Sequence, residues 1–313
     1  MNDISPNHLL SEDTIDLTQI TSSIWKYKFT IVAITFLFSV SSVFIALNTP
    51  DKYSSSALLQ VHSSSKGSMG SSMSSQLGGI AALAGISVNS GDSDKSYYTI
   101  EKVNSREFLR HLLSFNGVKE NLFASKGFDQ VSGETVFDEN IFFNNKWVRV
   151  PFDGKNSEPS YLEVYKEYVT NLSISKSKKS GYLKISFEHH SPVFAHDFLA
   201  LIIKEINEVS KQNDIKESER ALEYLAAQSK NIEQKNIKNS IKGLVDSQLE
   251  RLMLANIRDQ YLVSTIDAPF IAEENFYPSR PMIAIVGTII GFIFSLVIIF
   301  FREYFLRKKN NSF

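Results

Sequence analysis

The 313-residue chain contains no cysteine. This absence excludes disulfide bonds, thiolate metal sites and a cysteine nucleophile. It also suits an oxidising compartment, where a free thiol is a liability. The chain has little excess charge of either sign, because 33 basic and 34 acidic residues leave a formal net charge of −1. The sequence therefore gives no reason to expect a nucleic-acid partner, since such proteins usually carry a basic stripe or a basic excess.

Motifs that mark catalytic sites and cofactor sites are also absent from the sequence. There is no G-x-x-x-x-G-K-[ST] loop, no G-x-G-x-x-G turn and no G-x-S-x-G elbow. His189, His190 and His196 lie near one another, but their spacing lacks the further ligands that a metal site needs. Glu273 and Glu274 are adjacent, so on a strand they point to opposite faces and make a poor acid/base pair. We predict no catalytic, cofactor-binding or metal-binding residues and no cofactor.

Hydrophobic residues are concentrated in two uncharged runs, residues 29–47 and 282–301. About 20 residues at ~1.5 Å each cover roughly the 30 Å hydrocarbon thickness of a bilayer. The backbone in lipid must satisfy its own hydrogen bonds, so both runs predict transmembrane helices. A cleaved signal peptide is the alternative for the first run, but its length, its long leader and the lack of a clear A-x-A site favour an anchor. A buried core helix is the alternative for the second run, which is apolar on all sides rather than along one stripe.

The Lys and Arg residues beside the two runs predict how the chain crosses the membrane. One pair of ends carries Lys26, Lys28, Arg302, Arg307, Lys308 and Lys309, and the other pair carries only Lys52, Lys66 and Arg280. This bias predicts a two-pass protein of the bacterial inner membrane with both termini in the cytoplasm. The expected parts are a cytoplasmic leader at 1–28, a periplasmic domain at 48–281 and a cytoplasmic tail at 302–313.

The segment between the two runs begins with a strand pattern at residues 53–61 and continues into a Ser/Gly/Met-rich stretch at 63–93. This stretch is either a flexible insert or a mobile loop that folds onto a partner. Helical spacing follows at 97–115, with a start near Ser105, and further helices are predicted at 118–124 and 161–169. The Gly-, Asn-, Asp- and Pro-rich residues 128–159 predict a loop. Alternation on both sides of Lys-Lys-Ser-Gly predicts a β-hairpin at 171–189 with one buried face.

A long helical pattern at about 192–261 predicts a helical hairpin, with Ser191 as its cap and Pro192 in its first turn. The chain must return to the membrane, so we expect an outgoing arm of about 36 residues, ~54 Å long, and a returning arm of similar size. A projecting pair of helices lacks a core of its own. We therefore expect lateral contact with other copies, and a compact helical domain folded on itself is the alternative.

The second hydrophobic run carries the candidate site. Gly287 and Gly291 are four residues apart on one helix face, and small residues at this spacing let two helices approach closely. Pro278 and Pro281 stiffen the entry to the membrane, and Arg280 lies at the outer interface. We predict that these five residues contribute to contacts with other copies or with a partner.

Four stretches in this order resemble the polysaccharide co-polymerases of the Wzz family, the O-antigen chain-length determinants. They are IDLTQITSSIWKYK at 15–28, PDKYSSSALLQV at 50–61, LGGIAALAGI at 77–86 and DSQLERLMLANIRDQYLVSTIDAP at 246–269. The Pro- and Gly-containing second run completes the resemblance, which covers nearly the whole chain.

The resemblance implies an α+β periplasmic domain, with a mixed-sheet base and a long projecting α-helical hairpin, held by two transmembrane helices. It implies a ring-like homo-oligomer that acts with a membrane O-antigen polymerase on lipid-linked polysaccharide. Such a protein is a non-enzymatic regulator that sets the modal length of O antigen in lipopolysaccharide biosynthesis. The chain stops soon after Lys309, so the resemblance is to the type without a kinase domain. An adaptor in capsule or exopolysaccharide export is the alternative.

Overall fold

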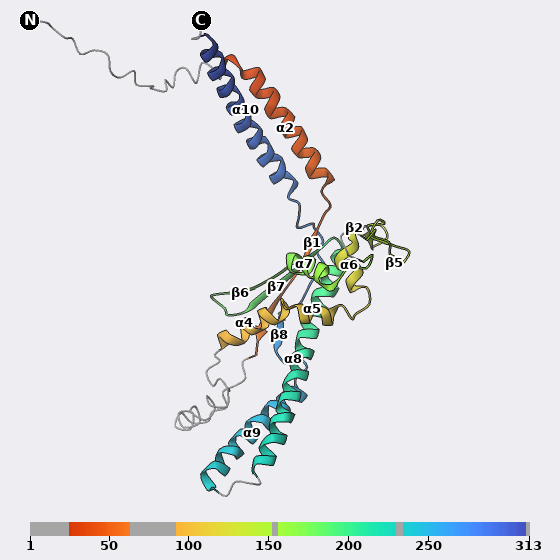
Figure 1. Ribbon diagram of the computed structural model, residues 1–313, viewed down its shortest axis with the longest axis vertical. Helices are drawn as coiled ribbons and strands as arrows, with labels where there is room; N and C mark the ends of the chain where they lie inside the picture. Colours follow the sequence, from red (N-terminus) through yellow and green to blue (C-terminus); the bar gives the residue numbers. More distant parts are fainter. Residues whose placement is uncertain (1–24, 63–91, 152–155, 230–233, 311–313) are drawn as a thin grey trace, which may run out of the picture. The chain divides into compact units, whose positions relative to one another are not determined.

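The computed structural model describes residues 25–62, 92–151, 156–229 and 234–310. The chain forms two compact units (Figure 1). One unit combines Met1–Pro50 with Pro278–Phe313, and the other is Asp51–Tyr277. The expected Ser/Gly/Met-rich stretch at 63–93 lies almost entirely outside the described residues, so its two interpretations stay open.

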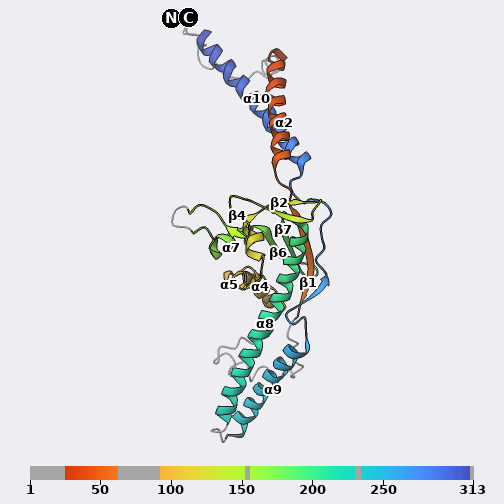
Figure 2. The same cartoon turned by 90° about the vertical axis from the view of Figure 1, so that its right-hand side faces the viewer.

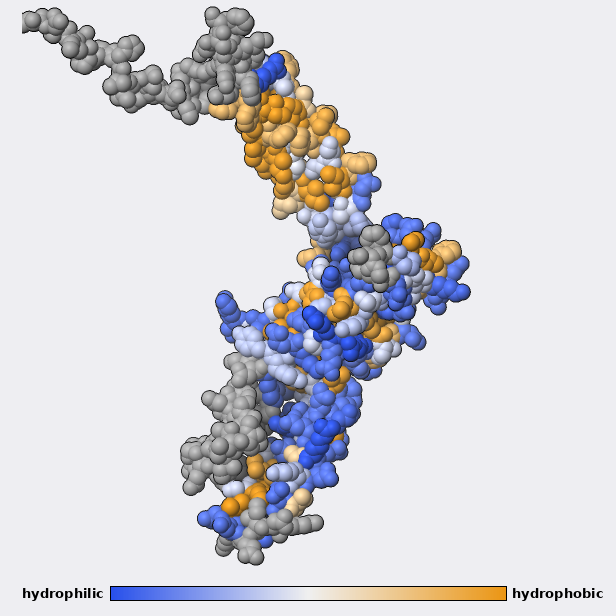
Figure 3. All heavy atoms as spheres, in the orientation of Figure 1, coloured by the Kyte–Doolittle hydropathy of each residue, from blue (hydrophilic) through white to orange (hydrophobic). Residues whose placement is uncertain are grey.

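The first unit is a pair of helices, α2 (Lys28–Asn48) and α10 (Arg280–Asn310). They lie side by side in Figure 1 and cross in Figure 2. Lys28–Asn48 and Arg280–Arg302 are long and apolar enough to cross a membrane. Their outward side chains are exposed hydrophobic residues such as Phe36, Ile290 and Phe294, and Figure 3 shows this unit as largely hydrophobic. Apolar side chains that cover all sides of a helix are suited to lipid rather than to water.

The second unit is built on a four-stranded sheet with the order β6-β7-β1-β8. Its strands are β1 (Tyr53–Val61), β6 (Leu172–Lys176), β7 (Leu183–His189) and β8 (Val263–Asp267). Each of the three pairings is antiparallel. The expected α+β class with two spanning helices is confirmed, but the sheet is antiparallel rather than mixed. The reason is that β1 inserts between β7 and β8, which run in the same direction but are not neighbours.

A layer of helices covers one face of the sheet (Figure 2); three of them contact its strands, and two pack on neighbouring helices. They are α4 (Asp92–Val103), α5 (Arg106–Leu112), α6 (Val118–Ala124), α7 (Tyr161–Asn171) and α8 (Pro192–Ser229). The predicted starts are confirmed, since Ser105 accepts a hydrogen bond from Phe108 N and Ser191 accepts one from Phe194 N.

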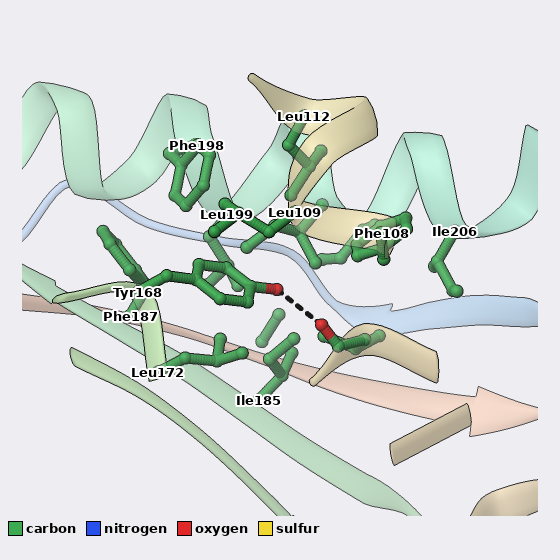
Figure 4. Packing of buried hydrophobic residues seen from close by; sticks show 14 of the residues in the cluster. Phe108, Leu109, Leu112, Tyr168, Leu172, Ile185, Phe187, Phe198, Leu199 and Ile206 are labelled. Atoms are coloured by element: carbon green, nitrogen blue, oxygen red, sulfur yellow. Dashed lines mark hydrogen bonds between the residues drawn. The ribbon is translucent and has the colours of Figure 1, made fainter. Parts of the chain in front are cut away.

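The hydrophobic core lies between this sheet and its helices (Figure 4). Leu183, Ile185 and Phe187 alternate into it from β7, as the predicted hairpin requires. Tyr168 is fully buried, and its hydroxyl donates a hydrogen bond of 2.8 Å to Val103 O. This bond joins α7 to the end of α4 and satisfies the one polar group of a large core side chain.

The predicted loop at 128–159 is wrong in part. Two short ladders occupy its first half, β2 (Ser125–Asp129) with β3 (Glu134–Phe137) and β4 (Phe142–Phe143) with β5 (Lys146–Trp147). Asn144 and Asn145 both have positive φ, 47° and 61°, as a two-residue hairpin turn of type I′ requires. The Asn-rich composition therefore supplies turns between short strands instead of a continuous loop.

The predicted helical hairpin is present as α8 and α9 (Lys235–Ile257), which pack against each other. The arms differ in length, because α8 has 38 residues and α9 only 23. The expectation of similar arms is wrong for a physical reason. The first half of α8 packs on the sheet through Phe198, Ile202 and Ile206, so α9 pairs only with the part that extends past it. The structure thus favours the projecting hairpin over the compact helical alternative.

Asn207 on α8 fixes the point where the returning chain joins the sheet. Its Nδ2 donates to Ile203 O and to Val263 O, both at 3.0 Å. Its Oδ1 accepts from Leu262 N at 2.8 Å and from Val263 N at 2.9 Å. The side chain is buried, and all its polar groups are paired. A single amide therefore holds the start of β8 against α8.

We expect Asn207→Ala to lower the free energy of unfolding by about 3 kcal/mol, because Leu262 N and Val263 N then lose their partner inside the protein. Urea unfolding of the detergent-solubilised chain, followed by circular dichroism, measures this loss. Asn256→Ala is the matched control, since Asn256 is an exposed helical asparagine on α9 whose side chain donates to Leu252 O of the same helix. Equal effects of the two substitutions would contradict the role given to Asn207.

Candidate functional site: the neck and the helix pair

The two ends of the second unit meet in a short bridge, which we call the neck (Lys52 with 275–277). Lys52 N donates to Tyr277 O at 2.7 Å, and Phe276 N donates to Lys52 O at 2.8 Å. Asn275 Nδ2 adds a bond of 2.8 Å to Asp51 Oδ1. Helix α2 ends four residues before Lys52, and α10 begins three residues after Tyr277. The chain therefore enters and leaves this unit at one point, next in sequence to both candidate spans.

A polar pocket lies beside the neck, lined in part by Lys52, Glu167, Glu188 and His190. Lys52 Nζ donates to Asn171 Oδ1 at 2.8 Å, which ties the neck to the end of α7. His190 Nδ1 lies 2.9 Å from Asp51 O, and burial lowers the pKa of its imidazole. These contacts anchor the chain where it leaves α2 rather than leaving charged groups free for chemistry.

His189 is a buried structural histidine at the same end of the sheet. Its Nδ1 accepts a hydrogen bond of 3.0 Å from Ser191 N, so the ring proton of the neutral imidazole lies on Nε2. Nε2 lies 2.9 Å from Asn121 O and 2.8 Å from Ser125 Oγ. A protonated Nε2 cannot take the hydroxyl proton, so Ser125 and His189 do not form a nucleophile and base.

The three neighbouring histidines do not converge on a metal. His196 Nδ1 pairs with Asp197 at 2.7 Å on α8, whereas His189 and His190 contact backbone carbonyls near the neck. Within residues 25–62, 92–151, 156–229 and 234–310, no group of three or more His, Cys, Asp or Glu residues could hold a metal ion.

Gly287 and Gly291 lie against α2 of the same chain. A Cβ built on Gly287 would overlap the Ser42 side chain, and one built on Gly291 would lie 2.5 Å from Phe38 Cβ. Only glycine allows this approach, as in other small-residue helix contacts. The role predicted for these glycines between copies stays a prediction, because the contact described here is within one chain.

The row that contains the glycines is longer than the sequence motif indicated. On α10 the inward positions follow a strict four-residue spacing through Ile283, Gly287, Gly291, Ser295 and Ile299, and rows of this kind pack into each other as ridges and grooves. Aligned with it on α2 are polar side chains that the sequence analysis did not single out. Ser42 Oγ donates to Ile283 O at 2.7 Å, and Thr288 Oγ1 bonds Ser39 Oγ at 3.2 Å. The signal was the three-residue spacing of Ser39 and Ser42 on one helix face of an uncharged run.

The other predicted site residues lie where α10 begins. Pro278 is buried, whereas Arg280 and Pro281 are exposed. Pro281 is the second residue of α10, a position in the first turn where the missing N–H costs nothing. The structure brings the two glycines together on one face, and it places these three residues apart from that face at the end of the helix.

We expect a disulfide to form within the chain between Ser39→Cys and Thr288→Cys, because their hydroxyls lie 3.2 Å apart and the chain has no cysteine of its own. Adding Gly291→Leu should lower the yield several-fold by separating the helices. The yield of the disulfide is measured by oxidising the protein in membranes and following its change in gel mobility. Val40→Cys with Ile289→Cys is the matched pair on the exposed faces. A covalent dimer in place of the shifted monomer would assign the face to contact between copies.

We expect stability to fall on acidification because of His189. Burial lowers the pKa of its imidazole from 6.5 to about 4. Above pH 6.5 neither folded nor unfolded chain binds this proton, and between 6.5 and 4 only the unfolded chain does. The free energy of unfolding therefore falls by about 1.4 kcal/mol per pH unit in this window. Urea titrations at pH 7, 6 and 5 measure the slope. An equal slope in His189→Gln would show that another group causes it.

The comparisons with known proteins agree with the resemblance in the sequence. Residues 13–114 match the model of the Wzz family, described as chain length determinant protein. This segment contains α2, β1, α4 and α5. A search of the curated proteins gives no match.

Two solved structures are similar to this chain at low sequence identity. A full-length bacterial polysaccharide co-polymerase is 13% identical, with a TM-score of 0.40 over 94% of this chain and 99% of that chain. A fragment of WzzB, a polysaccharide co-polymerase from Salmonella Typhimurium, is 14% identical, with a TM-score of 0.24 over 73% of this chain and 100% of that chain. Both TM-scores are below 0.5, so the argument for a family depends on the match over residues 13–114 alone. The family finding is therefore that residues 13–114 are similar to the Wzz family of chain length determinant proteins.

Proposed function

We propose that this protein is a non-enzymatic regulator of the bacterial inner membrane that sets the modal length of O antigen in lipopolysaccharide biosynthesis. The observation that carries the proposal is the Wzz family match over residues 13–114. In this role the protein assembles as a ring-like homo-oligomer and acts with a membrane polymerase on lipid-linked polysaccharide. In this proposal the protein holds the growing polysaccharide and the polymerase together, and it transfers no chemical group itself.

The neck supports a two-pass arrangement. Lys52 and Tyr277 are hydrogen-bonded to each other, so the unit from Asp51 to Tyr277 begins and ends at one point. This supports the proposal that both of its ends face the same side of a membrane. The flanking basic residues Lys26, Lys28 and Arg302 favour the cytoplasm for the outer ends of both helices. We therefore place residues 48–281 in the periplasm, with 1–28 and 302–313 in the cytoplasm.

The hairpin of α8 and α9 supports assembly of several copies. Leu249, Met253 and Ile257 are spaced by four residues on α9, and all three are exposed, Ile257 to 72%. Within the part of the chain that the structure describes, this stripe has no core partner, and a second copy is the partner we propose. Figure 3 shows hydrophobic side chains at this end of the unit. Gly287, Gly291, Pro278, Arg280 and Pro281 remain candidates for further contacts.

The test is a gel of lipopolysaccharide from a strain that makes O antigen, with and without the gene for this protein. We expect deletion to replace a clustered ladder by one that decays with chain length. Met253→Asp should reproduce this loss at normal protein level, because a buried charge opposes assembly.

Ser247→Asp is the matched control, since it adds the same charge at an exposed polar position of α9 and should leave the clustered ladder intact. Arg280→Ala and Gly291→Leu test the membrane end in the same assay. An unchanged ladder after deletion would end the proposal. Complete loss of surface polymer would instead favour the role as an export adaptor.

A further inference from the structure

Residues 125–150, which we call the β insert, carry several hydrophobic side chains that their short strands do not bury. The insert has its own aromatic cluster, in which the ring centroids of Phe142 lie 5.0 Å from Trp147 and 5.4 Å from Phe137. This closed cluster still leaves five apolar side chains in water. They are Val131, Val136, Phe143, Val148 and Val150, of which Val131 is 96% exposed and Val150 80%. Five exposed apolar residues within one short segment indicate a surface that binds a partner.

The β insert is fixed to the neck end of its unit. Gln130 Nε2 donates to Tyr53 Oη at 3.2 Å, and the ring of Phe128 packs edge-on against Tyr53 at 6.2 Å. Tyr53 directly follows Lys52, the residue that bridges to Tyr277. In Figure 2, β2 and β4 lie at the end of this unit away from the tip of α8 and α9. The turn that carries Val131 is therefore held beside Tyr53, at the start of β1.

The length of chain between that point and the candidate span is short. Helix α2 ends at Asn48, five residues before Tyr53. Five extended residues cover at most about 17 Å. The polar headgroup layer on one side of a bilayer is itself roughly 5–7 Å thick. The link therefore keeps Tyr53, and with it the turn that Gln130 ties to it, within about 17 Å of the end of α2.

The returning part of the neck also carries exposed hydrophobic residues. Phe276 is 62% exposed and Tyr277 49%, and both lie within four residues of Arg280, where α10 begins. Aromatic residues at this distance from a span are typical of the membrane interface. Two segments far apart in the sequence therefore bring exposed apolar side chains to the neck.

We propose that the β insert docks on the lipid surface beside the neck, with Val131 entering the headgroup region. The insert holds three basic and four acidic residues, so hydrophobic burial drives the contact and anionic lipid is not required. Docking gives the unit a second attachment besides the neck. It thereby restricts the tilt of α8 and α9 over the membrane.

The test uses the full chain in phosphatidylcholine vesicles with a bimane label on Val131→Cys, which is selective because the chain has no cysteine. Tyr224→Cys on α8, 64% exposed, is the matched control at the other end of the unit. Brominated acyl chains should quench the label at position 131 at least about twofold more than at 224, as expected for a side chain at the headgroup boundary. Equal quenching at the two positions overturns the proposal.

Two further measurements separate lipid from other partners. Shielding of the label at 131 from aqueous iodide without quenching by brominated lipid means a protein contact, and it also overturns the proposal. Trp147 provides a readout without a label once Trp25→Phe makes it the only tryptophan. Val131→Asp should then reduce quenching of Trp147 by brominated lipid, while Ser132→Asp, at the neighbouring exposed turn position, should reduce it less.

Discussion

The hydrogen bonds between Lys52 and Tyr277 are the constraint on which the rest of the structure depends. They require everything from Asp51 to Tyr277 to leave one point and return to it. Strands and helices that come in opposed pairs are one way for a chain of this length to meet that condition. The antiparallel sheet and the outgoing and returning helices of the hairpin are two forms of this requirement. Asn207 completes the return, because it captures the backbone at Leu262 and Val263 on the way from α9 to β8.

The two halves of α8 have different surroundings, because the chain must return to the point where it started. Its first half is part of the core, where Phe198, Leu199 and Ile202 are fully buried against the sheet. Among the described residues, its second half extends past the core and packs mainly against α9, and Tyr224 there is 64% exposed. Burial of apolar surface is the main stabilising term in folding, at roughly 25 cal/mol per Å². The projecting half gains little of it within one chain, and association between copies is the available way to gain more.

Features that depend on residues close together in the sequence could be predicted from it. The caps at Ser105 and Ser191, the alternation in β7 and the two apolar helices follow from residues a few positions apart. Long-range pairings could not be predicted in this way. Nothing near Asn207 indicates that its partners lie 55 residues later, and nothing near Tyr53 indicates that β1 separates β7 from β8. The β insert was missed because Asn and Gly mark both loops and the turns of very short strands.

The glycines of α10 show how a correct motif can leave its partner undetermined. A G-x-x-x-G face states that a helix approaches closely, and it does not state whose helix. Here the face is filled by Ser42 and Phe38 of the same chain. A contact between copies through Gly287 and Gly291 would have to displace α2 and break the bond from Ser42 to Ile283 O. An assembly that keeps this pair intact must use the outer surfaces of α2 and α10, which are apolar and exposed, together with the outer surface of the second unit. The pair of α2 and α10 then acts as an anchor, and contacts with other copies are made by surfaces outside this pair.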